Sequence, residues 1–78
     1  MKTKELVQRL CDVNNDMYRR NIIDKLEYKK NTKILIKTIK GRFNLSNKQL
    51  ELIHGIVKQN LNVTKLKLCM SMLQINFN

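Results

Sequence analysis

The chain has 78 residues, a formal net charge of +10 and an apolar fraction of 42%. This length predicts one small domain, residues 1–78, and the apolar fraction argues against wholesale disorder. The longest apolar run near the end is Leu68-Cys69-Met70, and the start lacks an apolar leader, so we expect neither a membrane span nor a secretory signal. The chain has two cysteines, Cys11 and Cys69, which are too few for a disulfide framework. Both are expected to be free thiols.

The first predicted helix covers about residues 4–20. Its apolar side chains recur at helical spacing through Leu6, Leu10, Val13 and Met17. This pattern places one apolar face of the helix against the rest of the domain.

The second predicted helix covers about residues 22–41 and is less regular. We expect Asn21 to cap its start and Gly41 to end it. The apolar face is interrupted near Asn31, which leaves open whether the helix is broken there. The alternative is a β-strand over residues 33–40, because this run is rich in β-branched side chains.

A capping signal opens the third predicted helix, since Ser46 is followed three residues later by Gln49. Residues 60–62 read as a turn, and Thr64 is expected to cap a fourth helix over about 65–75. The predicted fold class is therefore all-α, a small bundle of three to four helices.

The fourth predicted helix is apolar around much of its circumference. Such a helix is either central to the bundle or buried in a partner. In the second case its partner interface would be the face formed by Leu66, Met70, Leu73 and Phe77.

Positive charge is concentrated in the middle of the chain. Seven basic residues and no acidic one lie between Glu27 and Glu51, and five of the six acidic residues lie before residue 28. A field this one-sided predicts a polyanionic partner, with nucleic acid first and an acidic protein surface as the alternative.

Helical spacing gathers most of these charges on one side of the second helix. The predicted binding residues are Lys29, Lys30, Lys33, Lys37, Lys40 and Arg42. An apolar arc of Leu35, Ile36, Ile39 and Phe43 is expected beside them and is assigned to the core. Lysines act on phosphate as point charges, so binding should depend on the backbone and on salt. Tyr28 and Phe43 flank the stripe and are either base-stacking or core residues.

Codon bias offers another explanation for the lysines. The chain has no Pro and no Ala but much Lys, Asn and Ile, which indicates an AT-rich genome such as that of a phage or a low-GC bacterium. A solvated, lysine-rich face would follow from such bias alone. The missing acidic residues do not follow from it.

Residues 33–58 carry a pattern of a helix, Gly41, a short link, Leu45-Ser46-Asn47-Lys48-Gln49 and an amphipathic helix. This pattern resembles helical hairpins in phage proteins linked to replication or recombination. The resemblance implies the hairpin and a phage source, and carries over no functional residue.

Signals for catalysis or metal binding are weak. His54 lacks partners at a supportive spacing, Asp12 and Asp16 read as surface ion pairs, and Glu27-Tyr28-Lys29 matches a fragment of a nuclease motif. We therefore predict no enzyme, no cofactor and no metal. The sequence favours a small basic accessory protein of the bacterial host cytoplasm that binds DNA or RNA. The alternative is a protein–protein effector, or a homodimer, docking through the apolar last helix.

Overall fold

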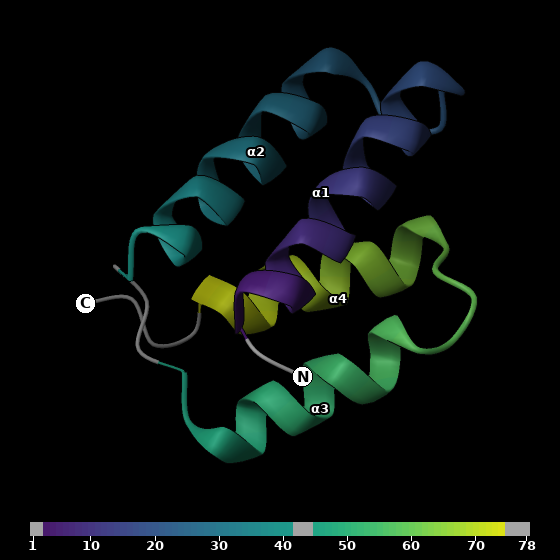
Figure 1. Cartoon of the computed structure of the whole chain (residues 1–78). Coiled ribbons are helices and arrows are strands. Elements are labelled where there is room, and N and C mark those ends of the chain that lie inside the picture. Colours follow the sequence, from purple (N-terminus) through teal and green to yellow (C-terminus); the bar gives the residue numbers. More distant parts are fainter. Residues whose placement is uncertain (1–2, 42–44, 75–78) are drawn as a thin grey trace.

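A computed structural model describes residues 3–41 and 45–74, which form four α-helices (Figure 1). They are α1 (Thr3–Arg19), α2 (Lys25–Ile39), α3 (Asn47–Val57) and α4 (Val63–Gln74). These two described stretches contain no strand. The all-α prediction is confirmed, and the strand alternative for residues 33–40 is excluded because this run lies in α2 and its C-terminal cap.

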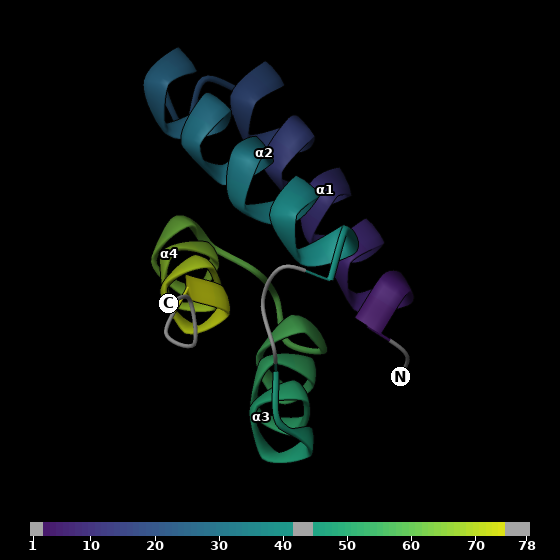
Figure 2. The same ribbon diagram turned by 90° about the vertical axis from the view of Figure 1, so that its left-hand side faces the viewer.

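Helices α1 and α2 lie side by side and antiparallel, and α3 and α4 close the other side of the bundle (Figures 1 and 2). Helix α4 packs against α1, α2 and α3, and α3 also packs against α1. Within the described part of the chain, α2 contacts α1 and α4 but not α3. One long side of α2 is therefore left uncovered by the other three described helices.

All four helices contribute to one apolar core. Its buried members are Leu6, Val7, Leu10, Met17, Ile23, Ile34, Leu35, Ile53, Val57, Leu66, Cys69, Met70 and Leu73. Burying a large aliphatic side chain contributes about 1.5–3 kcal/mol each, so this cluster is the main stabilising term of a small domain.

Two asparagines are buried where α1 meets α2. The Asn31 amide donates to Asn14 Oδ1 at 2.9 Å. The Asn14 amide in turn donates to Thr32 Oγ1 at 3.3 Å and to the Tyr28 carbonyl oxygen at 3.4 Å. No buried side-chain N or O atom among the described residues lacks a partner. The polar cluster is thus compatible with burial, because each amide is satisfied.

The α1–α2 junction differs from the predicted one. Asn21 does not cap α2; it has a φ of 59° and ends α1. The Ile22 N–H donates to the Met17 carbonyl and the Asn21 N–H to the Tyr18 carbonyl, which is a Schellman arrangement. Asparagine tolerates this left-handed backbone better than most residues. Asp24 caps α2 instead, accepting the Glu27 N–H at 2.8 Å.

Helix α2 is continuous through Asn31, which excludes a break at this point. The interruption of the apolar face marks the buried contact with Asn14 rather than an end of the helix. At the far end, Gly41 follows the cap Lys40 with a φ of 71°, a conformation that favours glycine, as the sequence predicts.

The capping box of α3 is confirmed, with Ser46 and Gln49 bonding each other's backbone N–H groups. The cap of α4 is Asn62 rather than Thr64, because Asn62 Oδ1 accepts the Lys65 N–H at 2.9 Å. Asparagine is at least as good an N-cap as threonine, and Asn62 directly precedes Val63, the first residue of α4.

The asparagine pair yields a stability prediction. Asn31→Leu should lower the free energy of unfolding by about 1–3 kcal/mol, because it leaves the buried Asn14 Oδ1 without its hydrogen-bond donor. Asn14→Leu with Asn31→Leu should cost less than the sum of the two single changes, since no polar atom is then stranded. Urea unfolding followed by circular dichroism measures all three values, with exposed Asn15→Leu as the control. Strict additivity would contradict the coupling.

Candidate nucleic-acid interface

The face that α2 turns inward decides where its lysines point. Its buried residues are Asn31, Ile34, Leu35 and Thr38, spaced three and four apart. The buried Thr38 hydroxyl donates to the Ile34 carbonyl at 2.9 Å, so it needs no water. The opposite side of α2 carries the lysines.

The predicted apolar arc is only partly right. Leu35 is buried, but Ile36 and Ile39 are 45% and 55% exposed and lie on the outer side with the lysines. The inner stripe runs through asparagine and threonine, which displaces these isoleucines from the core. Phe43 lies outside the described residues.

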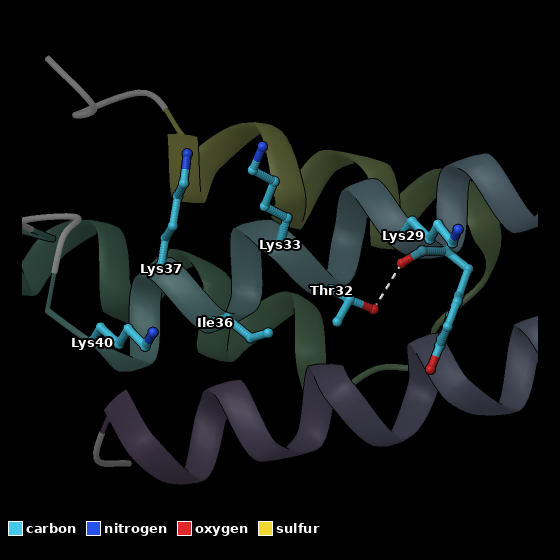
Figure 3. Close-up of a pocket in the computed structure, with 7 residues that line it drawn as sticks. Lys29, Thr32, Lys33, Ile36, Lys37 and Lys40 are labelled. Carbon is cyan, nitrogen blue, oxygen red and sulfur yellow. Dashed lines mark hydrogen bonds between the residues drawn. The ribbon is translucent and has the colours of Figure 1, made fainter.

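A shallow groove of about 420 Å³ runs along this outer side of α2 (Figure 3). We call it the lysine groove, and it is lined by Tyr28, Lys29, Thr32, Lys33, Ile36, Lys37 and Lys40. In Figure 3, Lys33 and Lys37 extend to one side of the helix, while Thr32 and Ile36 lie on the other. The lysine stems and Ile36 give the groove a largely apolar lining.

Four of the six predicted binding residues line the lysine groove. Lys30 is exposed but lies apart, lining a separate hollow between α2 and α4 with Glu27 and Lys67. Arg42 lies outside the described residues. The structure therefore brings Lys29, Lys33, Lys37 and Lys40 together and separates Lys30 from them.

Acidic neighbours are scarce at this surface. Within the described part of the chain, the ion pairs join Asp16 of α1 to Arg19 at 3.9 Å and to Arg20 at 3.4 Å. No carboxylate there lies within ion-pair distance of Lys29, Lys33 or Lys40. From Lys29 to Lys40 the charged edge extends about 16 Å along the helix axis.

No protein-family model, curated protein or solved structure matches this chain. The candidate interface is therefore interpreted from its own chemistry, which is a row of ammonium groups on one helix beside an apolar lining.

Tyr28 connects the lysine groove to α1. Its ring stacks on Tyr18 with centroids 4.4 Å apart and planes at 13°. Beyond this stack is a second hollow, lined by the two tyrosines with Asp12, Asn15 and Arg19. Sequence spacing placed Tyr28 beside the stripe but gave no sign of Tyr18, because the two rings meet only through the packing of α1 against α2.

The residues considered for catalysis do not assemble into a site. Asp16 pairs with arginines, and Asp12 accepts the Gln8 amide at 3.1 Å. The described residues include no group of three or more potential metal ligands. Desolvation, then the Lys58 charge, lowers the pKa of His54. Burial raises the pKa of Cys69 to about 11, so its thiol stays protonated at neutral pH.

The alternative interface on α4 falls inside the bundle. Leu66 and Leu73 are fully buried and Met70 nearly so, all against the chain's own core. Phe77 lies outside the described residues. The apolar character of α4 thus reflects its contacts with the other three helices, and these side chains present no surface to a partner in the folded chain.

None of the described helices combines the length and apolarity needed to span a membrane.

Paired substitutions on α4 distinguish core from interface. Leu73→Ala should lower the free energy of unfolding by about 2–5 kcal/mol, because it leaves a cavity among fully buried side chains. Leu68→Ala, at a side chain 50% exposed on the same helix, should change stability by about 0.5 kcal/mol or less. Thermal and urea unfolding measure both. Equal stabilities, or loss of self-association without loss of stability, would contradict the core assignment.

Proposed function

We propose that this protein is a small accessory protein that binds nucleic acid through the lysine groove, mainly by contact with backbone phosphates. The observation that supports this proposal most is the line of Lys29, Lys33, Lys37 and Lys40 on the side of α2 that faces away from the other described helices. A phage origin and action in the bacterial host cytoplasm are part of this proposal, supported by the codon bias and by the hairpin resemblance.

The arrangement suits phosphate better than it suits base edges. Lysine ammonium groups act as point charges without the fork geometry that arginine uses to read guanine. Lys29, Lys33 and Lys37 are one helical turn apart, about 6 Å along the axis, which is the scale of successive phosphate contacts. Binding should therefore have weak sequence preference and strong salt dependence.

Net charge alone is the competing explanation for any binding, because a chain of +10 attracts polyanions without a defined site. The helical placement makes the two explanations separable. A site on α2 is sensitive to where charge is removed, whereas a diffuse field is sensitive only to how much is removed.

Charge-reversal pairs test the site. Lys33→Glu with Lys37→Glu should abolish binding of a labelled oligonucleotide in fluorescence anisotropy, because both side chains line the lysine groove. Lys4→Glu with Arg9→Glu, both exposed on α1, changes the net charge equally and should leave most of the affinity. With about four phosphate contacts on duplex DNA, one for each lysine of the groove, log K should fall with log salt with a slope of about −3.6.

Two results would overturn the proposal. One is a wild-type chain that binds no nucleic acid at low salt. The other is equal loss of affinity in the two charge-matched pairs, since binding would then follow net charge instead of the lysine groove.

A further inference from the structure

The lysine groove has a lining that phosphate binding does not require. Ile36 lies beside the row of lysines with 45% of its surface exposed. Thr32 also lines the groove, but its hydroxyl donates to the Tyr28 carbonyl at 2.8 Å and accepts from Asn14, so it offers mainly its methyl group (Figure 3). Placing phosphates over exposed carbon gains nothing electrostatically, whereas an apolar ligand group placed there is removed from water.

Tyr28 provides an aromatic surface at one end of the same groove. Its ring is held by the stack on Tyr18, at 4.4 Å, and its carbonyl by the polar cluster at the α1–α2 contact. A ring fixed in this way loses little conformational entropy when a ligand stacks on it. The groove thus combines a preformed aromatic group, an aliphatic floor and a row of cations.

Unpaired nucleotides match this combination. A single strand carries phosphates on one side and flat base faces on the other, and base faces gain about 1–3 kcal/mol each from stacking on protein aromatics. In a duplex the base faces are covered by their stacked neighbours, which leaves base edges and phosphates for a protein to contact.

We infer that the lysine groove is a single-strand site, in which Lys29, Lys33, Lys37 and Lys40 hold the phosphates while bases lie on Ile36 and Tyr28. The inference rests on the proposed function and names its substrate class. An acidic amphipathic peptide is the competing occupant, since its carboxylates and apolar side chains would meet the same two features. The ring of Tyr28 beside the four lysines favours the nucleic acid, because bases stack on aromatic rings and the aliphatic side chains of a peptide do not require one.

The test compares four labelled probes by fluorescence anisotropy at one salt concentration: an oligothymidylate, the same backbone without bases, a duplex, and an amphipathic glutamate-rich peptide. The oligothymidylate should bind at least about 5-fold more tightly than the abasic strand, which corresponds to one stacked base. It should also bind more tightly than the duplex at this salt. Tyrosine fluorescence should be quenched by the oligothymidylate and not by the abasic strand.

Two variants assign the base-dependent part to the groove. Ile36→Gln should reduce the preference for the oligothymidylate over the abasic strand without changing abasic binding, because Ile36 is outside the core. Leu52→Gln, at a side chain 52% exposed on α3, is the matched control and should leave the preference unchanged. Lys33→Gln should weaken both strands by the same factor, since it removes a phosphate contact.

The outcomes separate the two proposals. Equal binding of the oligothymidylate and the abasic strand overturns the single-strand inference and leaves phosphate binding standing, as does tighter binding of the duplex. Binding of the peptide alone, with none of the three nucleic-acid probes bound, overturns both.

Discussion

The hydrogen bond between the buried amides of Asn14 and Asn31 fixes how α2 sits on α1. An amide in a core is tolerated only while its partners are in place, because an unsatisfied one costs about 1–3 kcal/mol. Rotating α2 by one residue would move Asn31 by about 100° and break the contact. Apolar contacts between the same helices tolerate small rotations, whereas this polar contact has one satisfied arrangement. The outward direction of the lysines therefore depends on a pair of side chains that never reach the surface.

The same constraint explains which features of the fold could be predicted from the sequence. Helix α1, the capping box at Ser46 and Gly41 at the end of α2 follow from local rules, because the periodicity, the side-chain bonds and the positive φ are all encoded within a few residues. The start of α2 and the inward face of α2 could not be derived in this way. Asn21 is a plausible cap by composition, but the hydrogen bonds of Ile22 and Asn21 back to α1 assign it to the preceding helix.

The lysines of the candidate site could be predicted from the sequence, but the apolar side chain of Ile36 beside them could not. Helical spacing alone places Lys29, Lys33 and Lys37 on one side. If only apolar residues are considered for burial, helical spacing places Ile36 in the core. Asn31 and Thr38 are buried in its place because Asn14 and a backbone carbonyl satisfy their polar atoms. Hydrogen bonds between residues far apart in the sequence do not affect the periodicity of apolar residues. The mixed surface of lysine and isoleucine therefore cannot be predicted without knowing how α1 packs on α2.

This arrangement is costly for stability, and the cost itself is informative. A helix optimised for folding would bury Ile36 and Ile39 and expose Asn31, since burying an isoleucine contributes more than burying a satisfied amide. The chain does the reverse and also places four lysines along the exposed side, where they repel one another. Codon bias can supply lysine and isoleucine, but it does not choose which side of a helix they occupy. A ligand that is both anionic and apolar would offset both costs, so the proposed single-strand site rests on the packing of α2 as well as on composition.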